Sequence, residues 1–324
     1  MTKISGNADR WGVLLLAHGA PDRLEDIPEF LLNVRGGRKL PEAAIQEIVR
    51  RYRLIGGSPL LRITNLQAEA LAEMLSRSAA EEGRELIPVH VGMRNWKPFI
   101  AEAVGQLSAN GANRLVALCL APQNSRTSVG LYRKHLNEAI EKTARPLRVE
   151  FIESWHDHPA LITAFRDRIS RALDGAGKAA GHAVPVIFTA HSVPEKTIAE
   201  GDPYDRQVKE TAAGIAAAMA LQHWRVAYQS QGMTPEPWIG PTVESQIDEL
   251  AAAGRHRAVI APIGFVSDHV EILYDIDVVF RAYGEAKGVT IFRSESLNDS
   301  PLFIQALASI VMARIRSASS VETH

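Results

Sequence analysis

WGVLLLAHG, at residues 11–19, is apolar on consecutive positions from Val13 to Ala17 and then ends in a histidine and a glycine. Strands that are apolar on consecutive rather than alternate positions are covered by helices on both faces, as in parallel sheets. The stretch therefore predicts a buried parallel strand. His18 lies at its carboxyl end, the edge where open α/β sheets bind ligands.

Similar strand-like runs recur along the chain, and helical patterns separate them. We predict strands at 11–17, 86–92, 114–121, 148–153, 185–190, 224–229, 257–263 and 289–293. Helices are predicted near 63–82, 98–109, 130–143, 160–173, 204–221, 242–253, 269–283 and 302–317. This alternation is typical of the α/β class with parallel sheets, and eight strands divide into four plus four.

A short sequence motif that occurs twice supports a chain of two similar halves. AHGAP at 17–21 ends the first strand, and AHSVP at 190–194 ends the fifth. Chance is the alternative, because these residue types are common after strands. We place the boundary at residue 150, giving domains 1–150 and 151–324, with the last helix free to pack on the first domain. His18 and His191 would then border one cleft between the halves.

Composition excludes several classes of protein. The 324 residues suit two domains of ordinary size. Lys plus Arg is 36 and Asp plus Glu is 37, so the chain lacks the basic surplus that nucleic-acid binding needs. One cysteine, Cys119, cannot form an internal disulfide or a four-cysteine iron–sulfur site. No apolar run reaches the length of a membrane span in the sequence, so we expect a cytoplasmic protein.

Familiar catalytic motifs are missing from the sequence. There is no G-x-G-x-x-G after the first strand, no P-loop, no G-x-S-x-G elbow and no H-E-x-x-H. Dinucleotide binding, P-loop phosphate binding and these two hydrolase types lose their main support. The Gly/Ala-rich residues 175–181 are expected to form a surface loop.

The densest polar cluster follows the seventh predicted strand. In a helix starting there, Asp268, Glu271 and Asp275 are at i, i+3 and i+7, which predicts one acidic face. Acids also favour any helix N-terminus through the helix dipole. The alternative is a carboxylate row that handles a metal or protons opposite His191, since imidazole and carboxylate together suit a divalent first-row cation.

Two other polar groups also leave alternatives open. His156 and His158 resemble a metal motif, but we favour a polar loop leading into a helix near Pro159. Basic residues gather between 35 and 53. They form either a solvated helix face or a rim that binds carboxylates, which arginine pairs with bidentately.

Sequence blocks along nearly the whole chain resemble those of the ferrochelatases. The blocks are NVRGGR at 33–38, RYRLIGGSPL at 51–60, APQNS at 121–125, ESW at 153–155, AHSVPEK at 190–196, GDPY at 201–204, YQSQG at 228–232, PWIGP at 237–241 and PIGFVSDHVE at 262–271. Each block is weak by itself. Their order and spacing make the resemblance specific.

The resemblance implies insertion of ferrous iron into a porphyrin during haem biosynthesis, by a metal chelatase of the lyase class. It implies two Rossmann-like, chelatase-type domains around a porphyrin cleft. The family's catalytic and metal-handling histidine and glutamate fall on His191 and Glu271, with Asp275 as a further metal position. Fe²⁺ enters as substrate, with no permanently bound cofactor and no iron–sulfur cluster. We expect a monomer that meets other haem-pathway enzymes transiently.

Within the family, the chain is similar to the bacterial coproporphyrin III type. That type's substrate contacts fall on Arg35, Arg51, Tyr52, Ser58 and Tyr132. Its iron-facing tyrosine is replaced by His18, which we keep as a substrate-binding residue. The family's acidic row often continues one turn past Asp275, but that position is Val279, and Gln123 stands where some relatives have histidine.

Two other functions are weighed against this one. A cobalt chelatase of corrin synthesis has strand ends similar to Leu16-Ala17-His18-Gly19, but the blocks between Arg35 and Ser58 argue against it. A non-catalytic tetrapyrrole or haem carrier is disfavoured by the intact His191 and Glu271. The sequence leaves coproporphyrin and protoporphyrin open as substrates.

Overall fold

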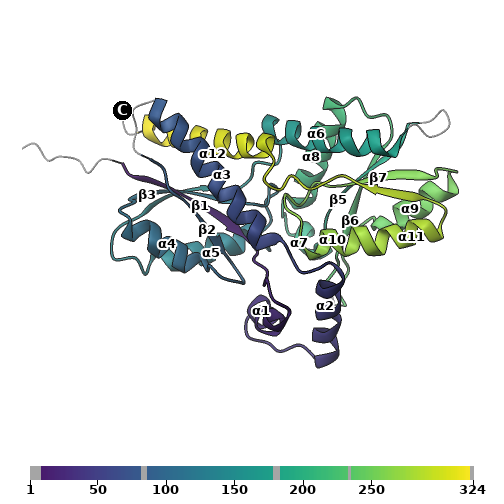
Figure 1. The fold of residues 1–324 in the computed structure, drawn as a ribbon, viewed down its shortest axis with the longest axis horizontal. Coiled ribbons are helices and arrows are strands. Elements are labelled where there is room, and N and C mark those ends of the chain that lie inside the picture. Colours follow the sequence, from purple (N-terminus) through teal and green to yellow (C-terminus); the bar gives the residue numbers. More distant parts are fainter. Residues whose placement is uncertain (1–8, 82–85, 178–182, 233–234, 322–324) are drawn as a thin grey trace, which may run out of the picture.

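The computed structural model describes residues 9–81, 86–177, 183–232 and 235–321 and contains two four-stranded parallel sheets (Figure 1). The first has the order β2-β1-β3-β4 and the second the order β6-β5-β7-β8, so the order of the first half is repeated in the second. This confirms the predicted α/β fold of two chelatase-type halves. The strands are β1 Trp11–Ala17, β2 Val89–Met93, β3 Arg114–Cys119, β4 Arg148–Ile152, β5 Val186–His191, β6 Trp224–Gln229, β7 Arg257–Pro262 and β8 Thr290–Arg293.

The helices cover both sheets much as the sequence predicts. Helices α3, α4, α5, α6, α8, α9 and α12 lie at the predicted places, and α1, α2 and α7 are additional. The bounds are α1 Ile27–Val34, α2 Glu42–Leu54, α3 Leu60–Glu81, α4 Ile100–Ala109, α5 Val129–Ile140, α6 Pro159–Ala176, α7 Glu195–Ala199, α8 Tyr204–Ala218, α9 Val243–Ala252 and α12 Pro301–Val321.

The predicted helix near 269–283 is wrong as a single element. It consists of α10 (Val270–Leu273), a π-helical turn (Asp275–Phe280) and α11 (Arg281–Ala286). The Val279 N–H donates to the Tyr274 carbonyl, five residues back, and this wider bond produces the π turn. The predicted loop at 175–181 also differs, because Gly175 and Ala176 complete α6, while residues 178–182 lie outside the described residues.

One continuous core joins the two halves. Val13 and Leu15 of β1 belong to the same buried cluster as Phe188 of β5 and Phe303 of α12. Helix α12 packs against α3 and β3 of the first half and against α6 of the second. The proposed boundary at residue 150 falls inside β4, which pairs with β3, so the change of sheet comes between β4 and β5. The domain division itself stays a prediction.

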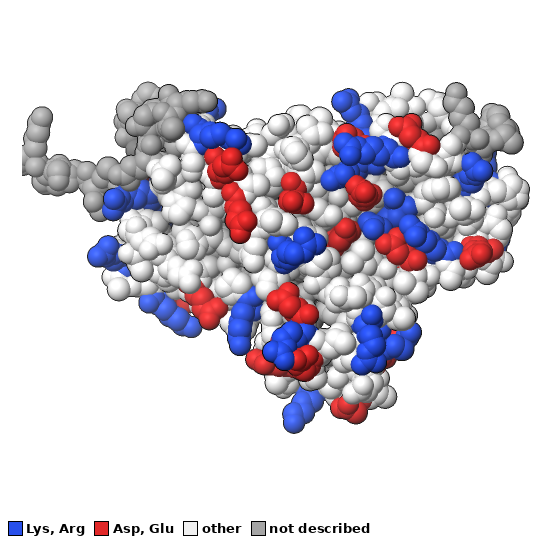
Figure 2. All heavy atoms as spheres, in the orientation of Figure 1, with Lys and Arg blue, Asp and Glu red and all other residues white. Residues whose placement is uncertain are grey.

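Helix α12 differs from one expectation drawn from the sequence. Within the described residues it is the one helix long and apolar enough to cross a membrane, over Pro301–Ser320. However, 56% of that window is buried inside the protein. On the face shown in Figure 2, acidic and basic side chains are interspersed.

Helices α1 and α2 project from the first half as a lip beside the second half (Figure 1). A small apolar cluster holds this lip together, with Phe30 and Leu31 of α1 and Tyr52 of α2 buried in it and Val270 of α10 packed against it. The lip also reaches the second half through Arg50, whose guanidinium donates to the Tyr274 hydroxyl at 2.8 Å. The lip is thereby fixed beside the carboxyl ends of β5 and β7.

Candidate active site

The strand ends of the second half bring His191 and Glu271 together. His191 is the last residue of β5, and Glu271 lies in the short helix after β7. The His191 Nε2 and a Glu271 carboxylate oxygen are 3.6 Å apart. The side chains are 37% and 34% exposed, so each keeps one side open to a substrate. The two residues predicted for catalysis therefore form one ion pair.

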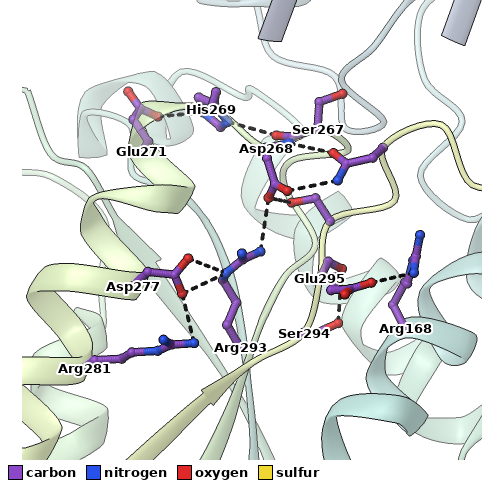
Figure 3. Close-up of polar contacts among 12 residues, drawn as sticks. Arg168, Ser267, Asp268, His269, Glu271, Asp277, Arg281, Arg293, Ser294 and Glu295 are labelled. Carbon is purple, nitrogen blue, oxygen red and sulfur yellow. Dashed lines mark hydrogen bonds and ion pairs between the residues drawn. The ribbon is translucent and has the colours of Figure 1, made fainter. Parts of the chain in front are cut away.

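A second histidine, His269, lies on the other oxygen of the same carboxylate. Its Nε2 is 3.6 Å from Glu271 Oε2, and its Nδ1 is 3.0 Å from the Ser267 carbonyl (Figure 3). The Phe265 ring packs 4.8 Å from the His269 ring. Sequence reasoning missed His269 as a site residue. Its position two residues before Glu271, at the start of α10, was the available signal.

The electrostatics of this trio favour a charged resting state. Desolvation alone would lower the pKa of His191, but the charge and hydrogen bond of Glu271, together with the Ser192 carbonyl and the Asp275 charge, outweigh it and raise the pKa to about 9. Desolvation alone would raise the pKa of Glu271, but the His191 and His269 partners hold it well below its usual range. His191 donates from Nδ1 to the Ser192 carbonyl, which directs Nε2 toward Glu271. An arriving divalent cation would therefore compete with the Nε2 proton of His191 for the carboxylate.

His18 faces the same site from the first half with the opposite charge state. Desolvation and the Arg94 charge lower its pKa to about 4, although Glu271 acts in the other direction. Its Nδ1 is 3.0 Å from the Gly19 carbonyl, which only accepts, so Nδ1 carries the hydrogen. The Nε2 lone pair of this neutral ring remains available. The influence of Glu271 and His269 on His18 is consistent with the predicted meeting of the two strand ends.

Asp268 does not share a face with Glu271, so the predicted three-acid row is wrong at this position. The backbone at His269 is extended, and the helix begins only at Val270. Asp268 instead accepts from Ser296 and Asn298 and pairs with Arg293 at 3.1 Å (Figure 3). This acid and its partners anchor the loop that carries His269.

A residue of the first half, Gln67, forms hydrogen bonds that hold the same loop. Gln67 of α3 is fully buried and donates to the Ser267 hydroxyl at 2.9 Å and to the Asn298 carbonyl at 2.8 Å. The Asn298 side chain in turn accepts from the Asp268 N–H. The position of the His269–Glu271 segment is therefore set jointly by both halves.

Asp275 lies one turn beyond Glu271, at the start of the π-helical turn. Desolvation and the Glu271 charge raise its pKa to about 6, and it accepts a hydrogen bond from Ser230. Val279 packs against the apolar core of the second half instead of extending an acidic row. In the parts of the chain that the structure describes, no three His, Cys, Asp or Glu side chains are preassembled as a metal site. A metal position at Asp275 stays a prediction.

The predicted substrate residues occupy two zones of the first half. Tyr52 is buried, and desolvation and then the Glu271 charge raise its pKa, which places it near the site. Arg51 lies over the Tyr274 ring at 5.1 Å and bonds Glu47. Tyr132 is also buried and lies beneath Arg94.

Arg35 and Ser58 lie at the end of α1 and before α3. Arg35 is exposed at the end of α1, and Ser58 is buried just before α3, where it accepts from the Leu60 N–H. A further residue that the sequence analysis did not select is Tyr204, which is buried and whose pKa is raised by desolvation and by the Glu271 charge.

The other polar residues singled out in the sequence have structural surroundings. His158 caps α6 by accepting from the Ala160 N–H, and His156 lies between Ser154 and Glu210. Gln123 is buried and donates to Thr211 and to the Ile263 carbonyl. These contacts agree with the polar-loop interpretation of the two histidines.

Comparison with known proteins decides the family. The ferrochelatase family model matches residues 10–315. The chain belongs to the ferrochelatase family. It is a metal chelatase that inserts iron into a porphyrin in haem synthesis, with porphyrin and iron as its substrates.

Individual relatives agree over nearly full length. A protein of Acidobacterium capsulatum named ferrochelatase is 44% identical, covering 94% of each chain. A coproporphyrin III ferrochelatase of Geobacillus thermodenitrificans is 37% identical, over 94% of this chain and 96% of its own. Among solved structures, SirB from Bacillus subtilis with Fe³⁺ aligns with a TM-score of 0.60 at 10% identity, over 96% of this chain and 98% of that one. The likeness to SirB concerns the fold alone.

Proposed function

We propose that this ferrochelatase inserts ferrous iron into coproporphyrin III, with His191 and Glu271 performing the chemistry. The observation that carries the proposal is the Glu271 carboxylate, held 3.6 Å from His191 on one oxygen and 3.6 Å from His269 on the other. A neutral His18 faces this group from the other half. The arrangement brings together a cation-attracting carboxylate and several imidazole nitrogens.

The chemistry of metalation gives each group a task. Two pyrrole protons must leave the macrocycle, and the iron must lose water ligands. Glu271 attracts Fe²⁺, and the arriving cation weakens the Glu271–His191 ion pair, so His191 releases its Nε2 proton to water. The neutral His191 Nε2 then accepts a proton from a pyrrole nitrogen, and Glu271 relays the second to solvent. Holding the macrocycle bent would expose its nitrogen lone pairs, at the expense of binding energy from its periphery.

The lip supports the choice of coproporphyrin. Coproporphyrin III carries four propionates, whereas protoporphyrin IX carries two. Arg51 has an exposed side chain and a surface ion pair with Glu47, which is weak enough to exchange for a substrate carboxylate. Arg35 is exposed on the same lip. The Geobacillus relatives named coproporphyrin III ferrochelatases add support at 37% identity.

A turnover assay with both porphyrins tests the substrate. Under anaerobic conditions, Fe²⁺ should quench the fluorescence of coproporphyrin III with at least a tenfold higher kcat/KM than that of protoporphyrin IX, about 1.4 kcal/mol in transition-state binding. Arg51→Ala should raise the KM for coproporphyrin more than that for protoporphyrin. Arg53→Ala, on the same helix, is the matched control. Equal kcat/KM for both porphyrins would contradict the proposed substrate.

The same assay separates the alternatives. Preference for Co²⁺ over Fe²⁺ on coproporphyrin would favour a cobalt chelatase, and haem binding without turnover would favour a carrier. We also propose that the enzyme acts in the cytoplasm as a monomer, meets haem-pathway enzymes transiently and needs no resident cofactor. The proposed lack of an iron–sulfur cluster is supported by the cysteine count, since Cys119 is the one cysteine of the sequence and is buried in β3.

A further inference from the structure

Arg94 lies directly beside His18 in the first half. It follows β2, and its backbone N–H donates to the Ala17 carbonyl at 3.0 Å, which fixes it next to the end of β1. Its guanidinium carbon lies 5.3 Å from the centre of the Tyr132 ring. The edge strand β2, the central strand β1 and helix α5 therefore hold this cation beside the site.

The guanidinium has no counter-charge among the described residues. Its Nη1 is buried without a hydrogen-bond partner, and no carboxylate forms an ion pair with it. By contrast, Arg51 bonds Glu47, and Arg293 pairs with Asp268 and Asp277. A buried donor of a charged group is costly to leave unpaired, so native structures rarely keep one without a use.

The charge of Arg94 affects several ionisable groups near the carboxyl ends of the strands in this sheet. It acts to lower the pKa of His18, of Tyr132 and of Cys119. The Arg94 cation lies among neutral groups. An anion bound there could form an ion pair with it without competing with a carboxylate of the protein. Arg94 as a whole is only partly buried.

We propose that Arg94 binds a propionate carboxylate of the porphyrin, forming an inner carboxylate subsite against Tyr132. This inference rests on the proposed function and adds a contact to it. The guanidinium has an unpartnered Nη1 donor, and arginine pairs with carboxylates bidentately through its planar N–H groups. The subsite is separate from the outer lip of Arg35 and Arg51, because it lies beside His18 at the strand ends.

Binding of two matched ligands tests the subsite. The Kd of coproporphyrin III and of its uncharged tetramethyl ester, carried in detergent, is measured by fluorescence for the wild type, Arg94→Met and Arg94→Lys. We expect Arg94→Met to raise the Kd of the acid at least tenfold and to leave that of the ester unchanged. Arg94→Lys should recover part of the loss. In turnover, the KM should rise with kcat nearly unchanged, which a merely structural role would not produce.

Arg133→Met is the control variant. Arg133 lies on α5 next to Tyr132, stacks on Phe151 and pairs with Glu153, so it is a stacked arginine with a counter-charge of its own. Its loss should not change either Kd. An unchanged Kd of the acid in Arg94→Met, or equal losses for acid and ester, would overturn the inference. If the wild type turns over only protoporphyrin IX, the proposed substrate fails, and protoporphyrin IX and its dimethyl ester then decide the role of Arg94.

Discussion

His18 and His191 occupy equivalent places in two sheets of the same strand order, yet their charge states are opposite. Each comes at the end of the first strand of its half, and each Nδ1 faces a nearby backbone carbonyl. The pKa of His18 is lowered to about 4, whereas that of His191 is raised to about 9. The difference comes from the partners, since His191 faces Glu271 and His18 lies beside the Arg94 charge. The repeated fold places each histidine at the end of a central strand, and the charge of the neighbouring residue determines whether the imidazole is protonated.

Removing His191 should produce the largest effect. His191→Asn keeps a polar side chain but removes the basic nitrogen that takes the pyrrole proton. We expect turnover to fall by about 10²–10⁴-fold, the usual contribution of a general base, while the Kd of coproporphyrin changes little. Anaerobic turnover and fluorescence titration measure the two effects. Wild-type turnover in this variant would remove His191 from the mechanism.

Neutralising Glu271 should make His191 behave more like His18. Glu271→Gln keeps the size of the side chain but removes the charge that raises the pKa of His191. We expect turnover to fall by about 10²-fold, and an NMR titration should show the His191 pKa below 9. Asp268→Asn is the control on the same loop, and it should leave the His191 pKa in place. A loss of stability alone in Glu271→Gln would favour the helix-dipole interpretation of this acid.

Replacing His18 by tyrosine should have a smaller effect. The His18 ring packs on Phe30 at 5.9 Å and leaves its Nε2 free. His18→Tyr should keep turnover within a few-fold of the wild type and should change the absorption spectrum of the ferric product, because phenolate replaces imidazole as the ligand. An identical product spectrum in both proteins would show that His18 does not ligate the iron.

The strands were predicted closely because their apolar runs are a local property. A strand that is covered by helices on both faces of its sheet needs apolar residues at consecutive positions. The strands β1 and β6 have the predicted bounds. β2 begins at Val89 rather than at residue 86, since Pro88 has no N–H for the ladder and only its carbonyl joins Val13. These errors stay within a few residues and leave the fold unchanged.

The errors at the site have a different origin. Helical spacing places Asp268 on the same face as Glu271. Its side chain instead bonds to Arg293, Ser296 and Asn298, which come later in the chain, and so points away from Glu271. His269 was missed because its position two residues before Glu271 indicates only that the two residues are near in sequence, and not that their side chains meet. The positions of Asp268 and His269 both depend on the extended backbone at His269. Tertiary contacts impose this conformation, and the spacing of residues in the sequence cannot reveal it.

The pH dependence of stability should show the smallest effect, with opposite signs for the two histidines. The pKa of His191 is higher in the folded protein, about 9 against 6.5 unfolded, so its stabilisation is complete below about pH 6.5 and is lost as the pH rises toward 9. The pKa of His18 is lower in the folded protein, about 4, so the unfolded chain binds the proton more readily. Stability should therefore fall as the pH drops from 6.5 toward 4.

Thermal unfolding of the wild type, His191→Asn and His18→Asn from pH 4 to pH 9 separates the two contributions. His191→Asn should flatten the alkaline limb of Tm against pH, and His18→Asn should flatten the acid limb. Because both rings keep an open side, each change should amount to roughly a few degrees at most. The two limbs report on different halves of the molecule. A variant that flattened the wrong limb would show that the pKa values of the two strand-end histidines had been assigned in reverse.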